Sequence, residues 1–146
     1  MDSPWLSWVT FVPAVGLWCA ALAPPALRAP GPGASFHYTG LHCLLLGWIG
    51  LFGKPEWALP WLANVLYWIS LIWGIFRREP GREALVLSLI AIPLALITLV
   101  NRNIETNEAG DRTAVVVGPA FYLWVASMVA LAAAQFFASS APRAAN

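Results

Sequence analysis

The residues able to do chemistry gather in two segments, 37–56 and 105–112. They are two histidines, one cysteine, four acidic residues and one arginine: His37, His42, Cys43, Glu56, Glu105, Glu108, Asp111 and Arg112. His37 and His42 with a carboxylate would suit zinc, but their spacing does not fit one helical face and no third ligand is near. A nucleophilic Cys43–His37 pair would need an orienting residue and an oxyanion site. We therefore predict no catalytic residue, no metal site and no cofactor, and interpret this group as solvated loop residues.

Composition indicates that these loops belong to a membrane protein. Of 146 residues, 60% are hydrophobic, 13% aromatic and 10% charged, whereas soluble domains carry about 25% charged residues. Eight cationic and seven acidic side chains nearly cancel, which argues against nucleic acid as a partner. The charges cluster in 77–83 and 102–112, as expected of links between spans. The predicted partner is the lipid bilayer.

Four apolar segments approach the roughly 20 residues that a helix needs to cross a bilayer. They cover about 5–23, 57–76, 84–101 and 119–138, and they predict an all-α membrane bundle that forms one domain over 1–146. The first segment is not preceded by positive charge and contains three tryptophans, so we expect a retained span and not a signal peptide. Pro119 should begin the last helix, and the β-branched run 113–117 before it favours extended backbone.

Arginines predict the orientation of the spans. The link 77–83 contains three arginines in RREPGR, and Arg143 follows the last span. The positive-inside rule places both on the cytoplasmic side. The C-terminus is then cytoplasmic, and 24–56 and 102–118 form outer segments. The stretch APPALRAPGPG (23–33) predicts an irregular loop.

The segment LHCLLLGWIGLFG (41–53) leaves the number of spans open. As a helix it would be about 20 Å long, which is short for a crossing, so we favour four spans plus a short interfacial or re-entrant helix here. A full crossing would draw SFHYTG into the bilayer and give five spans with the N-terminus outside. Small residues at Cys43, Gly47 and Gly50 share one side with Lys54, which predicts that this side packs onto the bundle.

Helical faces within the spans carry further expectations. Asn64 shares a face with tryptophans at 57, 61 and 68, and inside lipid its amide needs a partner, either on another helix or on a ligand. Ser127 is expected to bond the backbone of the turn before it, and Gln135 to reach water at the inner end. Small residues recur along 84–101 and predict close packing, within the chain or against another protein: Ala84, Ser88, Ala91, Ala95 and Thr98. Aromatic anchors at the membrane surface are expected of Trp5, Trp48, Trp57, Tyr122 and Trp124.

Three blocks resemble those of a known group of proteins. GWIG (47–50), WLANVLYW (61–68) and FYLWVAS (121–127) are similar to recurring blocks of small uncharacterised multispanning bacterial membrane proteins. NEAG (107–110) resembles their short acidic-glycine outer link, whereas Val65 stands where proline is expected. The blocks cover about half of the chain. The resemblance implies a helical protein of the bacterial cytoplasmic (inner) membrane and no particular activity.

Two functions follow as hypotheses. The first is a non-enzymatic accessory or structural subunit of a larger membrane complex, with a membrane protein or a second copy as its partner. Its lateral helix-packing interface would consist of Gly47, Gly50, Ser88, Ala91, Ala95 and Thr98. The alternative is a protein or enzyme that binds a lipid, quinone or pigment at the outer membrane face, through Trp61, Asn64 and Arg112. No span has a charged residue in its middle, which argues against a proton-coupled carrier.

Overall fold

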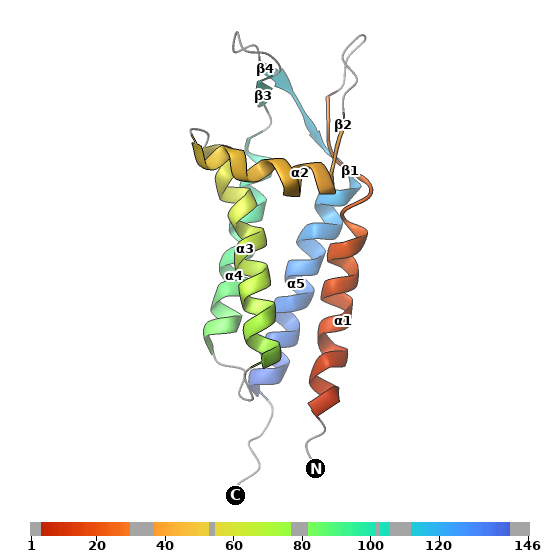
Figure 1. Ribbon diagram of the computed structural model, residues 1–146, viewed down its shortest axis with the longest axis vertical. Coiled ribbons are helices and arrows are strands. Elements are labelled where there is room, and N and C mark those ends of the chain that lie inside the picture. The colour runs from red at the N-terminus through yellow and green to blue at the C-terminus, as the bar shows by residue number, and fades with distance from the viewer. Residues whose placement is uncertain are drawn as a thin grey trace, which may run out of the picture.

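The chain forms an elongated helical bundle with strands and a crosswise helix at one end (Figure 1). The computed structural model describes residues 4–29, 37–52, 55–76, 82–101, 103–105 and 112–140. The helices along the bundle are α1 (Pro4–Ala20), α3 (Pro55–Phe76), α4 (Arg82–Leu96) and α5 (Pro119–Ser140). α1 begins and α5 ends at the end of the bundle that is remote from the strands (Figure 1).

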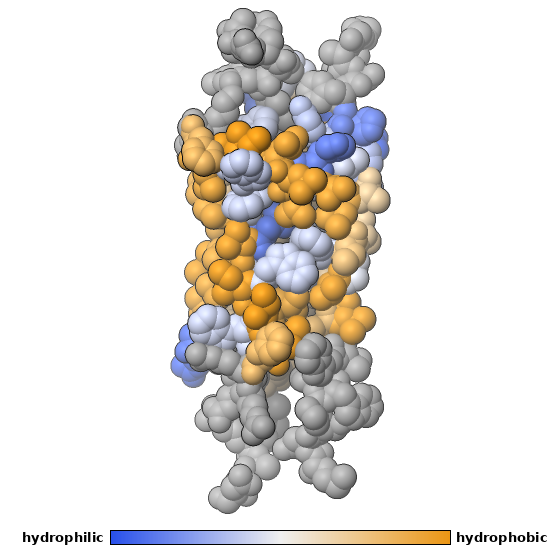
Figure 2. Space-filling model, in the orientation of Figure 1, coloured by the Kyte–Doolittle hydropathy of each residue, from blue (hydrophilic) through white to orange (hydrophobic). Residues whose placement is uncertain are grey.

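Three helical stretches in the described residues are long and apolar enough to cross a membrane. They are Trp57–Phe76, Arg82–Leu99 and Pro119–Ser139. Large apolar side chains such as Ile72 and Leu89 are about half exposed on them, and Figure 2 shows an apolar band around the middle of the molecule. These features define an integral membrane protein. The crossing expected over 5–23 is not among the three, because α1 has 17 residues and is shorter than each of them.

Local signals explain where the helices end. α5 begins at Pro119, as predicted, because proline in the first turn loses no hydrogen bond. α4 continues through Pro93 and then tightens into the 3-10 turn η2 (Ile97–Leu99). α1 ends before residue 23, the predicted limit: Leu22 N donates to Cys19 O over 3.1 Å in a tightened last turn, and prolines follow at 24 and 25.

Two small antiparallel sheets lie at one end of the bundle. In the first, β1 (Pro25–Arg28) pairs with both β2 (His37–Thr39) and β5 (Val116–Val117). In the second, β3 (Asn103–Glu105) pairs with β4 (Arg112–Ala114). The irregular loop predicted for 23–33 is therefore wrong at Pro25–Arg28, whereas extended backbone within 113–117 is confirmed. The fold is mostly helical, but the all-α prediction missed these sheets: their strands have two to four residues, and β5 lies nearly ninety residues from β1.

Two glycines let the first sheet join three helices. The Cα of Gly40, the first residue of α2 (Gly40–Leu46), lies against the Ala21 carbonyl, and Gly118 lies against the Pro25 carbonyl. A Cβ at either position would overlap backbone atoms. Gly118 N also donates to Ala26 O over 2.7 Å. The end of α1 and the starts of α2 and α5 are thus tied together through β1.

α2 and the 3-10 helix η1 (Gly47–Phe52) run across the end of the bundle (Figure 1). Their limits nearly match the predicted 41–53. A capping box starts α2: the Thr39 hydroxyl accepts from His42 N over 3.3 Å, and His42 Nδ1 accepts from Thr39 N over 3.4 Å. Sequence analysis missed this box because the common motif has Glu or Gln where His42 stands.

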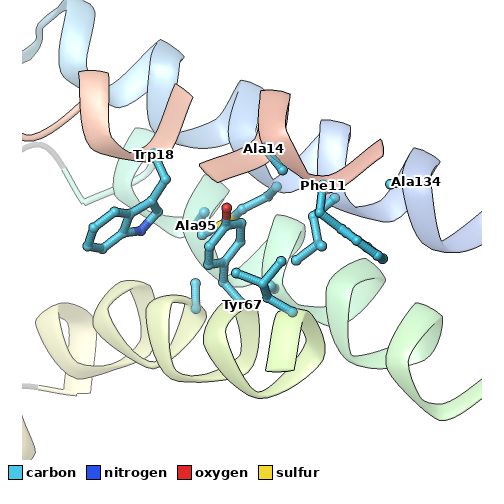
Figure 3. Close-up of a cluster of buried hydrophobic side chains, with 11 residues drawn as sticks. Phe11, Ala14, Trp18, Tyr67, Ala95 and Ala134 are labelled. Carbon is cyan, nitrogen blue, oxygen red and sulfur yellow. The ribbon is translucent and has the colours of Figure 1, made fainter. Parts of the chain in front are cut away.

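The core contains the predicted small-residue stripe of α4. Ala84, Ser88, Ala91 and Ala95 have no exposed surface, because α4 packs between α3 and α5. α5 also packs on α1, so α1 and α3 close the ring of helices. Trp18 of α1 lies beside Tyr67 of α3 in this core (Figure 3), with ring centroids 6.4 Å apart. The stripe therefore packs within the chain.

Candidate ligand cavity

A cavity of about 200 Å³ lies at the strand end of the bundle. α1, α3 and α5 form its walls, and α2 with η1 lies against it. β2 and α2 add Tyr38 and His42 to its aromatic lining. The other five aromatic lining residues come from three of the long helices: Trp18, Trp57, Trp61, Phe121 and Trp124. None of the described residues that line it is Asp, Glu, Lys or Arg. An apolar hollow with a few polar groups is the usual form of a small-molecule site.

Asn64 joins three helices at the wall of this cavity. Its Oδ1 accepts from Trp124 Nε1 over 2.9 Å and from Trp18 Nε1 over 3.2 Å. Because both indole nitrogens can only donate, they fix which side of the amide carries the oxygen. The Nδ2 group then faces away from both indoles, and it has no hydrogen-bond partner among the described residues. A cavity-lining residue is thus left with two unused N–H donors.

α2 and η1 rest on α3 through a second indole contact. Trp61 Nε1 donates to Leu44 O over 2.9 Å. A Cβ on Gly47 would lie 2.6 Å from Trp61 Cδ1, and one on Gly50 would lie 2.8 Å from Ala58 N. Glycine at both positions therefore allows the close approach of this crosswise segment to α3.

The thiol and imidazoles nearby do not form a reactive set. Burial raises the pKa of the Cys43 thiol to about 11, so the thiol is protonated at neutral pH and is a poor nucleophile. His42 Nδ1 lies 2.9 Å from the Thr39 hydroxyl within the capping box, while His37 lies in β2. In the described part of the chain, no three His, Cys, Asp or Glu side chains could hold a metal ion.

The structure brings two of the three predicted ligand residues together. Trp61 and Asn64 both line the cavity. Arg112 lies in β4, but its side chain is outside the described residues. The other outer charges, Arg102, Glu108 and Asp111, fall outside the described residues altogether, as do Lys54 and Arg143.

The predicted packing residues lie inside the chain. Gly47 and Gly50 face α3, Ser88, Ala91 and Ala95 lie in the core, and Thr98 lines the cavity from η2. The Ser88 hydroxyl donates to Leu85 O over 2.8 Å, and Ser127 donates to Trp124 O over 2.6 Å, as predicted for Ser127.

The aromatic residues expected at the membrane surface divide into two groups. Trp48 and Tyr122 are 46% and 61% exposed among the described residues. Trp57 and Trp124 are half-buried and line the cavity. Trp5 lies in α1, and its side chain is outside the described residues.

A second polar contact lies nearer the other end of the bundle. Gln135 is 1% exposed, and its Nε2 donates to Ser70 O over 2.9 Å. The Ser70 hydroxyl in turn donates to Ala84 O over 2.7 Å, which links α3 to α4. The prediction that Gln135 reaches water is therefore wrong. Gly74 makes room for it, since a Cβ there would lie 2.6 Å from Gln135 Nε2.

Sequence reasoning missed Trp18 as a cavity residue. Trp18 lies two residues before the end of α1, whereas Asn64 lies nine residues after the start of α3 and Trp124 five residues after the start of α5. These offsets from the common end differ, so counting residues along the helices does not pair Asn64 with the two indoles.

No protein-family model, curated protein or solved structure matches this chain. The geometry of the cavity is therefore the basis for the functional conclusion.

Proposed function

We propose that this integral membrane protein binds a hydrophobic small molecule in the cavity beneath α2, at the outer face of a bacterial cytoplasmic membrane. The observation that supports this proposal is a largely apolar hollow with indole rings in its walls, in which Asn64, one of several polar lining residues, retains free donors. Aromatic walls with a few placed polar groups suit a lipid, a quinone or a pigment.

The membrane arrangement belongs to the same proposal. α1 serves as a fourth crossing beside the three long helices, and α2 with η1 lies along the outer surface. The start of α1 and the end of α5 lie at one end of the bundle (Figure 1), which supports an even number of crossings with both termini cytoplasmic. A reporter enzyme that is active only outside the cytoplasm should be inactive when fused to either terminus.

The hypothesis of a lateral subunit has less support from this geometry. Its proposed interface relied on the α4 stripe, and Ser88, Ala91 and Ala95 have no exposed surface. A partner would instead have to pack on large exposed side chains, such as Leu89 or Phe136, which lipid also covers. Binding to a larger complex therefore remains a prediction without a specific contact to carry it.

Filling the cavity tests the proposal directly. Thr98 lines the cavity and is half-buried, so Thr98→Phe places a ring where the ligand would lie. Leu89→Phe is the matched control, because Leu89 lies on α4 and is 51% exposed. After purification in mild detergent, small molecules are extracted from each variant and counted per chain by mass spectrometry.

We expect wild-type protein and Leu89→Phe to retain about one molecule of the same compound per chain, and Thr98→Phe to retain much less. The proposal fails if all three proteins carry the same mixture of bulk lipids. It also fails if Thr98→Phe folds like the wild type and retains the same compound.

A further inference from the structure

We propose that the ligand is an uncharged lipid that presents a carbonyl oxygen to Asn64 Nδ2, as an isoprenoid quinone or a neutral glyceride does. This inference rests on the proposed function and adds the chemical class of the ligand. It combines the hydrogen bonds of the Asn64 amide, the lack of charged residues in the described cavity wall, and the sparse contact between α1 and α3 beside Asn64.

The Asn64 amide selects an acceptor. Its oxygen is already used by Trp18 and Trp124, so what it offers a ligand is the N–H side. A donor left unpaired in an apolar site costs free energy, and a carbonyl oxygen on the ligand removes that cost. A ligand that can only donate, or one that is a pure hydrocarbon, leaves the amide unsatisfied.

The wall of the cavity selects against charge. No Asp, Glu, Lys or Arg is among its described lining residues. A phosphate or an ammonium group buried there would lose its hydration without gaining an ion partner among the described residues, which is expensive in an apolar site. Indole faces can stack on a planar ring or pack against acyl chains. Both sources of the carbonyl therefore stay open, and the experiment distinguishes them.

The bundle is loosest where such a lipid would enter. α1 and α3 make few contacts with each other, and among them Trp18 meets Trp68 edge to face at 4.9 Å and hydrogen-bonds Asn64. Figure 2 shows hydrophilic atoms recessed within the apolar band of the molecule. Asn64 itself is half-buried, so the apolar tail of a ligand can remain in lipid while its carbonyl bonds the amide.

The test must separate the ligand contact of Asn64 from its role in joining helices. The double variant Trp18→Phe/Trp124→Phe removes both indole donors, keeps an aromatic ring at each position and keeps Asn64. Adding Asn64→Leu gives a triple variant in which the donors and acceptor are removed together, a change that proteins tolerate far better than removal of one partner. The two variants differ only at Asn64. Decylubiquinone, dioleoylglycerol and phosphatidylglycerol are titrated into each detergent-solubilised protein, and bound ligand is counted by native mass spectrometry.

We expect one of the two uncharged lipids to bind the wild type and, more weakly, the double variant, because Trp18 and Trp124 also line the cavity. The triple variant should bind it roughly tenfold more weakly than the double variant does, the effect of one lost hydrogen bond. Preference for decylubiquinone identifies a ring carbonyl, and preference for dioleoylglycerol identifies an ester carbonyl. Equal binding by the double and triple variants overturns the contact with Asn64. Preferential binding of phosphatidylglycerol overturns the uncharged class but leaves the proposed function standing, whereas saturable binding of none of the three contradicts both.

Discussion

At the scale of residues, Asn64 shows how one amide organises the cavity end of the bundle. Its position within an apolar face of α3 indicated that it needs a partner, and two indole donors from α1 and α5 fill that need. The residue type predicted the requirement, but not the partners, because those depend on the depth at which neighbouring helices pass each other. The same reasoning failed at Gln135, where a pocket made by Gly74 allows full burial.

Removing a buried polar group that has hydrogen-bond partners should lower the stability of the protein, whereas removing one without a partner should not. Asn64→Leu leaves two indole N–H groups without an acceptor and should destabilise the protein by about 1–3 kcal/mol. Tyr67 has no exposed surface, and its hydroxyl makes no hydrogen bond of good geometry among the described residues, since the nearby Ser127 hydroxyl donates to Trp124 O. Tyr67→Phe removes that unsatisfied group and should leave stability unchanged or raise it. Thermal unfolding in detergent, followed by helical circular dichroism, measures both variants. A large loss in Tyr67→Phe would indicate that the hydroxyl has a partner within the folded protein.

At the scale of elements, the crosswise segment α2–η1 makes the cavity possible. Its length marked it as too short to cross a membrane, and its small residues indicated a side that packs. The break from α-helix into 3-10 helix at Gly47 was not predictable from that pattern. It depends on close contact with Trp61, which belongs to another helix.

Replacing Gly47 by alanine should therefore disturb the packing of α2, whereas the same replacement at Gly16 should not. A Cβ on Gly47 meets the Trp61 ring at 2.6 Å, whereas one on Gly16 meets nothing within 4 Å. Gly47→Ala should push α2 away from α3 at a cost of about 1–3 kcal/mol. The amides of residues 40–52 should then exchange hydrogen roughly tenfold faster, and Gly16→Ala should leave their exchange unchanged. Equal exchange in both variants would contradict the close packing of α2–η1 on α3.

At the scale of the whole molecule, the apolar runs predicted the long helices within a few residues, because the thickness of a bilayer sets their length. The β1–β5 pairing could not be predicted from the sequence, since it joins residues that are nearly ninety positions apart. The cavity depends on that pairing, on Gly40 and Gly118 at the sheet, and on the ring of helices closing through Trp18. It is a property of the assembled bundle.

The most direct test of a ligand-binding bundle is the native mass of wild-type protein purified from its own membranes in mild detergent. The chain alone has a mass of 15.8 kDa. We predict that each chain carries one additional small molecule, and that the same molecule is recovered after the protein is denatured. A particle whose mass is that of the bare chain would contradict ligand binding. A stoichiometric complex with other proteins and no retained small molecule would also contradict it, and would favour the subunit hypothesis instead.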